Sequence, residues 1–477
     1  MSSTKQTIIR LTGDINYCGP VGPFVDELLK KRKDEVLIFR KNHSILNLHN
    51  ENIQIVGVAN NEKTSWNSIL QITRHPANGG LVKVYTKSGR TTTATLSHSF
   101  LKRTNNGITT LKGSDLKLGD RIPIARFIPI VKEPTEELKI GEHNIKLDKK
   151  FGWICGAFLA DGRIDGREIK VSKILVEFEN NIRDFCKIIN ENVIIKTKQG
   201  EYGLSKTIIF KDKGFATFFK DNFGNGSYNN KIPAFVFSAN LDFIKGLISG
   251  YFDGDGNINS QKYMIRCASR SEELIEGMSI LLTYCGIFCS KLKEKSIRQP
   301  NKVSHTLSVQ KKYAKDFKDK IGFDVKEKEQ ELDKIIAYNN RKDKQSDQDT
   351  IDQIPELMGT LREISSLLGL PKHNFAPSIG RRTLQTYIQL FKRENSTMSK
   401  NIQQQANNLL KILEQAANSD VVWDKIVKLE YLDDPKEYVY DFTVPGNDSF
   451  MVDCGVLVHN TLNTLLNRVP KWIYIIC

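Results

Sequence analysis

The sequence predicts a multidomain protein in which an all-β domain is split in two by an inserted α/β domain and a small helical domain. Three observations support this prediction. Strand-like segments fill both ends of the 477-residue chain, an internal repeat of helical and strand-like segments fills the middle, and amphipathic helical segments separate the repeat from the last strands. At about 100–200 residues per domain, this length allows two to four domains.

The domain boundaries follow from where the residue pattern changes. We expect the halves of the β-rich domain in residues 1–125 and 418–460, the α/β repeat in 126–336, the helical part in 337–417, and a short flank in 461–477. Hydrophobic residues make up 39% of the chain and charged residues 26%, an ordinary balance for domains with apolar cores.

Charge and cysteine usage narrow the partners and the compartment. The net charge of +15 favours a polyanion such as nucleic acid, although a solvated basic surface gives the same value. Eight cysteines without a CxxC pair or zinc spacing fit a reducing, intracellular compartment. No stretch approaches about 18 apolar residues, so we expect no membrane span. The first residues, MSSTKQTIIRLTGD, lack the features of a secretory signal.

The ends of the chain read mainly as strands. LVKVYTKSGRTTTATLSHSF alternates apolar and polar residues around a Ser-Gly turn, which predicts a hairpin. GPFVDELLKK predicts one helix near the N-terminus, and GDRIPIARFIPI predicts short extended runs. Near the C-terminus, VVWDKIVKLEYL, EYVYDFTV and SFMVDCGVLV again have strand character.

The middle of the chain contains a loose repeat. Each half has an apolar helix that ends in Asp-Gly, a strand-rich stretch, and a helix with Phe and Lys. Aligning the halves places Asp161 opposite Asp255, 94 residues later. This period is too long for a solenoid and predicts two fused half-domains of α/β character.

A polar linker is expected at residues 337–350, followed by two amphipathic helices within 358–392 and a third at 399–417. Ile364, Leu367 and Leu368 form an apolar face on the first helix, and Arg381 and Arg382 begin the second. The pattern allows either a DNA-binding helix-turn-helix or a small structural helical subdomain.

Residues near the C-terminus suggest self-cleavage. An asparagine side-chain amide can attack its own backbone carbonyl, which forms a succinimide and breaks the next peptide bond when a neighbouring acid protonates the leaving amine. In VYDFTVPGNDSFMVDCGVLVHNT, His459 precedes Asn460, and Thr461 supplies a hydroxyl nucleophile for acyl transfer. A bare His-Asn-Thr tripeptide is otherwise typical of a surface turn.

With the preceding strands and VYDFTV, this segment resembles the C-terminal splicing motifs of inteins. The resemblance implies an all-β Hint splicing domain in which Asn460 cyclises, His459 assists it, and Thr461 is the downstream nucleophile. It also implies that Asp441 tunes nucleophile protonation. One departure is Asp448, which stands where many inteins carry a histidine, so we expect cyclisation to depend more heavily on His459.

The string TLSH resembles the TxxH motif of inteins, which implies that Thr95 and His98 contact the upstream scissile peptide and assist an acyl shift. On a strand, both residues are otherwise typical structural residues. Ser2 fits the first nucleophile, because Thr7 and Ile9 then have the spacing found in inteins. Cys18 is a rival candidate for the first nucleophile. The alternative interpretation of Cys18 is a partly buried structural cysteine.

The two helices of the repeat, ICGAFLADG and ISGYFDGDG, carry Gly156 and Gly250 where close helix packing needs small residues. Packed side by side, they place Asp161 and Asp255 together, and paired carboxylates can hold Mg²⁺ for phosphodiester cleavage.

These motifs resemble the single-chain LAGLIDADG homing endonucleases of the DOD type. The resemblance also implies a catalytic lysine at Lys231, in NNKIPAF, and a second at Lys326 or Lys328, of which we prefer Lys328. The alternatives are a helix pair without catalysis and lysines that are ordinary surface charges.

The sequence therefore predicts a bifunctional intein. It would combine autocatalytic protein splicing, which needs no cofactor, with Mg²⁺-dependent cleavage of double-stranded DNA. Its partners would be the DNA target and the flanking host (extein) segments, and we expect a monomer, located in the cytoplasm or nucleus with its host. The alternative is a homing endonuclease whose splicing domain is inactive or limited to C-terminal cleavage. TLNT, residues 461–464, resembles a segment of the largest RNA polymerase subunit.

Overall fold

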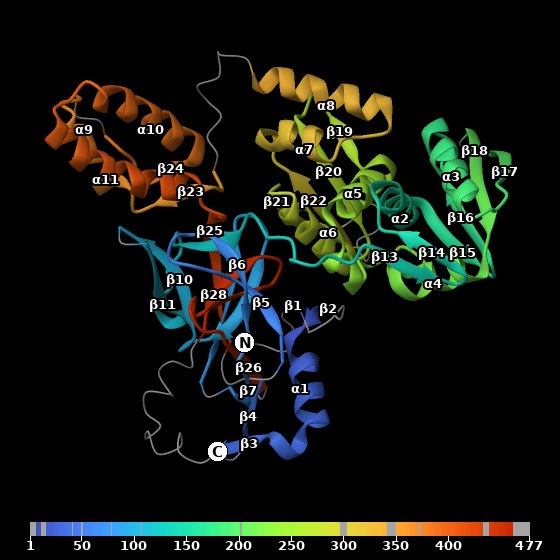
Figure 1. Cartoon of the computed structure of the whole chain (residues 1–477), viewed down its shortest axis with the longest axis horizontal. Helices are drawn as coiled ribbons and strands as arrows, with labels where there is room; N and C mark the ends of the chain where they lie inside the picture. The colour runs from blue at the N-terminus through green and yellow to red at the C-terminus, as the bar shows by residue number, and fades with distance from the viewer. Residues whose placement is uncertain are drawn as a thin grey trace. The chain divides into compact units, whose positions relative to one another are not determined.

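The computed structural model divides the chain into two compact units (Figure 1). Unit 1 contains Met1–Gly13, Tyr17–Pro129 and Gln345–Cys477, and unit 2 contains Ile130–Lys344 with Asp14–Asn16. The structure describes residues 6–10, 16–40, 42–48, 51–77, 79–105, 107–200, 203–295, 303–340, 350–371, 374–432 and 438–460. No helix in these described ranges is long and apolar enough to cross a membrane.

Unit 1 is mainly β-structure from both ends of the sequence. One four-stranded sheet has the order β2-β1-β5-β6, another the order β26-β7-β4-β3, and an eight-stranded sheet has the order β11-β10-β28-β12-β25-β8-β9 with β27 on β28. The first half contributes β1 (Gln6–Arg10), β2 (Asn16–Pro20), α1 (Val21–Lys31), β3 (Leu37–Arg40), β4 (His43–Asn47), β5 (Gln54–Val58), β6 (Thr64–Ser68), β7 (Gln71–Pro76), β8 (Leu81–Thr86), β9 (Thr91–Thr95), β10 (Ser99–Thr104), β11 (Gly107–Lys112) and β12 (Arg121–Ala125). The second half contributes β25 (Val421–Leu432), β26 (Tyr438–Thr443), β27 (Ser449–Val452) and β28 (Val456–His459).

The predicted hairpin is confirmed as β8 and β9. Side chains of β8 alternate between buried and half-buried positions, as expected for a strand with one face on the core. The turn closes through a hydrogen bond from the Thr86 N–H to the Arg90 carbonyl at 2.9 Å, and Gly89 takes the positive φ of +83° that the turn requires.

A buried arginine on β10 ties the eight-stranded sheet to the segment that precedes α9. The Arg103 Nε donates to Glu62 Oε1 at 2.8 Å, and both side chains are almost fully buried. Arg103 also donates to the carbonyls of Pro355 and Glu356. Charges are tolerated inside a protein when they are paired and hydrogen-bonded in this way.

Three helices, α9 (Met358–Leu367), α10 (Arg381–Asn395) and α11 (Lys400–Ala417), form the helical part of unit 1 (Figure 1). Between α9 and α10 lies β24 (Ser378–Gly380), which pairs with β23 (Gln353–Pro355). This connection differs from the three- or four-residue turn of a helix-turn-helix.

The helix α10 begins at Arg381, as the sequence indicates, but the side chain of this residue is buried rather than exposed. Its guanidinium pairs with Asp352 at 2.7 Å and donates to the carbonyls of Ala416, Ala417 and Val421. Arg381 therefore fastens α10 to the start of β25, and of the two arginines only Arg382 is exposed to solvent.

Unit 2 confirms the internal repeat. The first half contains α2 (Lys149–Asp161), β15 (Gly162–Asp165), β16 (Glu168–Ser172), α3 (Val176–Ile188), β17 (Ile194–Gly200), β18 (Gly203–Lys211) and α4 (Lys213–Phe223). The second half contains α5 (Leu241–Asp255), β19 (Asn257–Asn259), β20 (Met264–Ser269), α6 (Glu272–Tyr284), β21 (Cys289–Lys295), β22 (Val303–Val309), α7 (Ala314–Lys320) and α8 (Lys326–Asn339). The two sheets have the same order, β15-β16-β18-β17 and β19-β20-β22-β21, and β13 (Glu137–Ile140) pairs with β14 (His143–Lys146) ahead of α2.

The helices α2 and α5 pack backbone to backbone through glycines. A Cβ added to Gly156 would lie 2.1 Å from the Leu247 carbonyl oxygen, and one added to Gly250 would lie 2.1 Å from the Trp153 carbonyl oxygen. Only glycine fits at such contacts. The two helices can therefore approach this closely because both positions are glycine.

We predict that Gly156→Ala lowers the unfolding free energy of unit 2 by about 3 kcal/mol, because the added methyl group forces the two helices apart. Denaturant unfolding followed by circular dichroism measures this change. Gly359→Ala on α9 is the matched control, because its Cβ would meet only the Asn105 side chain at 3.7 Å. That variant should be neutral or slightly stabilised, and equal losses in both variants would contradict the packing argument.

Candidate functional site

The strand β28 carries the C-terminal residues of the predicted splicing motif to the middle of the eight-stranded sheet. It pairs with β27, with β10 through Phe100 and Val458, and with β12 through Ile124 and Val456. Phe100 lies two residues after His98, and Val458 lies two residues before Asn460. The TLSH turn and the His459-Asn460 dipeptide therefore lie close together at one end of this sheet.

Asn460 is buried and held by its amide groups. Its backbone N–H donates to the Asp448 carbonyl at 2.8 Å. The side-chain Nδ2 donates to the Val444 carbonyl at 3.3 Å and to Asp448 Oδ1 at 3.4 Å. The Oδ1 of Asn460 is buried without a hydrogen-bond partner in the described part of the chain. The Asn460 side chain is thus oriented through its nitrogen.

The two histidines occupy different environments. His459 is half-buried, and its Nδ1 is buried with no hydrogen-bond partner within the described ranges. His98 is 2% exposed, with its ring edge-on to Phe100 at 5.9 Å. Its backbone N–H donates to the Thr95 carbonyl at 3.0 Å, which closes the turn, and the Thr95 hydroxyl lies 3.2 Å from that of Ser97.

Asp441 lies on β26, opposite Thr73 of β7, and is buried. Its Oδ1 accepts the N–H of Phe442 at 2.9 Å. Of the predicted N-terminal residues, Ile9 pairs with Ile55 across β1 and β5, and Cys18 lies half-exposed on β2. Ser2 and Thr461 lie outside the described residues.

In unit 2, the helices α2 and α5 end at Asp161 and Asp255, as the motifs predict. Asp255 adjoins a cavity of about 320 Å³. Its pKa is raised from 3.8 to about 7, first because the surrounding protein removes water and then because of the negative charge of Asp161. The two carboxylates therefore interact electrostatically.

Two lysines reach the same place. The Lys173 ammonium pairs with Asp161 at 2.7 Å and donates to the Gly254 carbonyl at 3.0 Å. The Lys328 ammonium donates to the carbonyls of Phe252 and Asp253 at 2.8 and 2.7 Å. Burial, followed by the neighbouring charge of Lys173, lowers the pKa of Lys328 to about 8.

Lys173 is a candidate that the sequence analysis missed. It follows directly after β16, the second strand of the first half-domain, and only the pairing of β15 with β16 brings it back to Asp161. Arg270 holds the matching position after β20 and lines the cavity beside Asp255. The two halves thus place a positively charged side chain at equivalent positions.

Lys231 has a different environment from Lys328. It is half-exposed, and its backbone N–H donates to the Phe223 carbonyl at 3.0 Å. Among the contacts described for the structure, none joins its ammonium to Asp161 or Asp255. Lys326, the first residue of α8, is exposed.

Asp253 explains how Lys328 is positioned. Its carboxylate accepts hydrogen bonds from the Trp153 indole at 2.7 Å and from the backbone N–H groups of Asp324 and Val325 at 3.1 Å. Burial raises its pKa to about 6 despite these bonds. Asp253 therefore links α2, α5 and the start of α8, the helix that carries Lys328.

A divalent cation fits the pair of carboxylates. Asp161 and Asp255 are hard oxygen donors, and the charge of Asp161 adds to the effect of burial in raising the pKa of Asp255, so a cation would stabilise the ionised pair. Within the described ranges, no group of three or more His, Cys, Asp or Glu side chains surrounds one point. An ion there would need further oxygen ligands from solvent or substrate.

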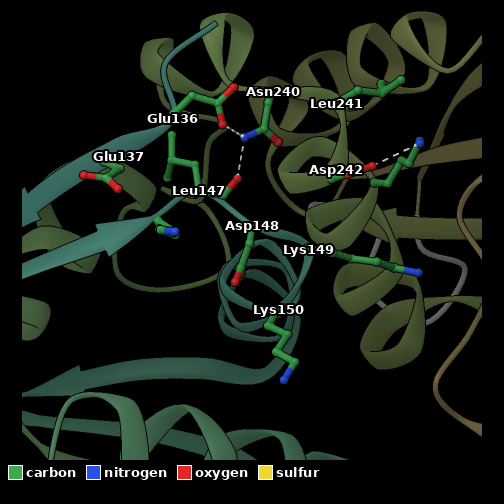
Figure 2. A pocket seen from close by; sticks show the side chains of 11 residues that line it. Glu136, Glu137, Leu147, Asp148, Lys149, Lys150, Asn240, Leu241 and Asp242 are labelled. Atoms are coloured by element: carbon green, nitrogen blue, oxygen red, sulfur yellow. Dashed lines mark hydrogen bonds and ion pairs between the residues drawn. The ribbon is translucent and has the colours of Figure 1, made fainter.

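A larger cavity of about 710 Å³ lies at the other ends of α2 and α5 (Figure 2). Its charged side chains are of both signs, Lys245 pairs with Asp242, and the neutral Asn240 amide donates to Glu136. Asp148 and Asn240 cap the two helices by accepting N–H groups in their first turns. These contacts make the cavity a structural feature rather than a candidate site.

Unit 1 has the features of a self-processing β-domain. It places the buried Asn460 next to His459 and close to the TLSH turn, which carries a second histidine, His98. The family model described as the intein splicing domain matches residues 25–460. The chain therefore belongs to the intein family.

Similar proteins include three from Methanocaldococcus jannaschii. The chain is 35% identical to DNA-directed RNA polymerase subunit Rpo1C over 96% of its own length and 55% of the relative's. It is 28% identical to a probable translation initiation factor IF-2, covering 69% of this chain and 32% of the relative. For transcription initiation factor IIB the identity is 24%, covering 52% and 34%. The chain thus spans about half of the first relative and a third of the other two.

Solved structures give partial similarities. A mini-intein from transcription factor IIB of Mvu has 20% identity and a TM-score of 0.25, covering 28% of this chain and 71% of that one. Mesophilic variants of the homing endonuclease I-DmoI have 12% identity and a TM-score of 0.30, covering 37% and 96%.

The raised pKa of Asp255 predicts a pH-dependent stability. Between about pH 4 and pH 7 the unfolded chain has lost a proton that the folded chain retains, so the stability contributed by this residue falls as pH rises. Asp255→Asn removes the titration. The unfolding free energy of the variant relative to the wild type should therefore increase from pH 5 to pH 8. Urea unfolding in the presence of a chelator measures the difference, and a gain that is equal at both pH values contradicts the prediction.

Proposed function

We propose that the chain is a bifunctional intein whose unit 1 splices itself out of a host protein and whose unit 2 cleaves double-stranded DNA. The observation that carries the first activity is the fixed Asn460 side chain, held at its Nδ2 on the strand that adjoins the TLSH turn. Membership of the intein family supports the same activity. The interruption of unit 1 between Pro129 and Gln345, where unit 2 lies in the sequence, supports an endonuclease inserted into a Hint domain.

The splicing reaction assigns each group a role. Ser2 takes the upstream acyl group in an N-to-O shift, assisted by Thr95 and by His98, which protonates the leaving nitrogen. Thr461 receives the acyl group by transesterification. Cyclisation of Asn460 then breaks the bond before Thr461, with His459 protonating the leaving amine. Asp441 tunes protonation of the nucleophile.

We predict that Asn460→Ala abolishes release of the C-terminal flank and that His459→Ala slows it by about 100-fold or more, because the leaving amine loses its acid. The chain is expressed between two unrelated flanks, and the products are weighed by mass spectrometry. Wild-type release of only the C-terminal flank would favour the alternative of a cleavage-limited domain. Wild-type chains that release no flank would contradict the splicing proposal.

For DNA cleavage, Asp161 and Asp255 are the groups that would hold Mg²⁺, which supplies a site for activating water and neutralising the leaving oxygen. Lys173 and Lys328 would offset the charge of the scissile phosphate, and the lowered pKa of Lys328 suits it to exchange a proton near neutral pH. Lys231 remains a predicted catalytic residue whose position differs from that of these two lysines.

We predict that Asp161→Asn and Asp255→Asn abolish cleavage of duplex DNA in which the coding sequences of the two host flanks are joined. Lys173→Ala should slow cleavage by about 100-fold and by more than Lys231→Ala, because the Lys173 ammonium pairs with Asp161. Lys187→Ala, which removes an exposed lysine of α3, is the control. Unchanged cleavage by both aspartate variants would leave unit 2 as a DNA-binding domain without catalysis.

The host is proposed from the similarity to Rpo1C. The match covers 96% of this chain but only 55% of that subunit. TLNT, the segment after Asn460, resembles the largest RNA polymerase subunit. We therefore propose a host of this class, which places the intein wherever that polymerase resides.

A further inference from the structure

Asp448 contacts Asn460 at both of its donor groups. The backbone carbonyl of Asp448 accepts the Asn460 N–H at 2.8 Å, and its carboxylate Oδ1 lies 3.4 Å from Nδ2, the atom that attacks during cyclisation. Asp448 has a left-handed backbone with φ of +47°, in a turn closed by its own N–H on the Val444 carbonyl at 3.1 Å. The first and last residues of this turn, Val444 and Asp448, thus both accept hydrogen bonds from Asn460.

The two acceptors of Nδ2 differ in chemistry. The Val444 carbonyl, at 3.3 Å, can orient an N–H but cannot take its proton. The Asp448 carboxylate can orient an N–H and can also accept the proton as the nitrogen becomes positive during attack. Because the amide oxygen of Asn460 has no partner within the described ranges, these two contacts alone orient the side chain there.

We propose that Asp448 is a catalytic residue of asparagine cyclisation, as the proton acceptor for Nδ2. The inference rests on the proposed splicing function and changes one expectation from the sequence. Asp448 stands where many inteins carry a histidine, and from the sequence we expect cyclisation to depend more heavily on His459. With Asp448 as the proton acceptor, a base is present at that position after all.

During cyclisation one carbon–nitrogen bond forms and one breaks. Nδ2 forms a bond to the Asn460 backbone carbonyl carbon, and one of its two protons passes to Asp448 Oδ1. The bond from that carbon to the nitrogen of Thr461 breaks, and this nitrogen takes a proton from His459. The products are a C-terminal succinimide and a free amine, and solvent returns Asp448 and His459 to their starting protonation states.

The test is the first-order rate of release of the C-terminal flank at pH 7 from the full chain between two unrelated flanks. Asp448→Asn keeps the shape, the tolerance for positive φ and a hydrogen-bond acceptor, but it cannot take a proton. We expect release to slow by about 100-fold or more. Asp448→His restores a proton acceptor and should release the flank at least about tenfold faster than Asp448→Asn.

Asp120→Asn is the matched control, because this carboxylate also accepts a hydrogen bond in a turn of the same unit, here from the backbone N–H of Lys117. It should release the flank within about threefold of the wild-type rate. Thermal unfolding of each variant confirms that the chain is folded.

If the wild type releases the flank and Asp448→Asn does so at a similar rate, Asp448 is not the base, although the proposed splicing function is retained. If Asp448→His is as slow as Asp448→Asn, proton acceptance is likewise overturned. If the wild type releases no flank, both proposals fail.

Discussion

The pairing of β28 with strands from the first third of the chain is the constraint on which unit 1 depends. This four-residue strand pairs along its whole length with β27, and it also pairs with β10 through Val458 and with β12 through Val456. Ser449, the first residue of β27, donates its hydroxyl to the Val58 carbonyl and accepts the Val58 N–H, both at 2.9 Å, so β27 is fixed to β5 as well. Since β1 pairs with β5, residues from both ends of the domain are held at one place.

A fully buried arginine supports this arrangement from the other end of β28. The turn before the strand contains Asp453, Cys454 and Gly455, all with positive φ, which is a costly run for the two residues that are not glycine. The Arg90 Nε donates to the Cys454 carbonyl at 2.9 Å, and the Ala125 N–H donates to the Gly455 carbonyl at 2.7 Å. These bonds hold the turn in place, and the turn sets where His459 and Asn460 lie.

Much of the fold could be predicted because its signals are local. The alternation in β8 and β9, the helices that end at Asp161 and Asp255, and the close packing at Gly156 and Gly250 all follow from a few adjacent residues. Contacts made by tertiary pairing were not accessible in this way. Lys173 gives no signal in the sequence until β15 and β16 pair, and the burial of Arg381 depends on Asp352 and on carbonyls near residue 420. The site residues named from the sequence remain predictions.

The two proposed centres use carboxylates in opposite electrostatic settings. In unit 2, burial and then the like charge of Asp161 raise the pKa of Asp255 to about 7. Such a group is suited to binding a metal, since removal of its proton is coupled to arrival of the ion. In unit 1, the Asp448 carboxylate faces a neutral amide, and its half-exposed position gives it access to water. A carboxylate in this position can accept a proton from Nδ2 and exchange it with water.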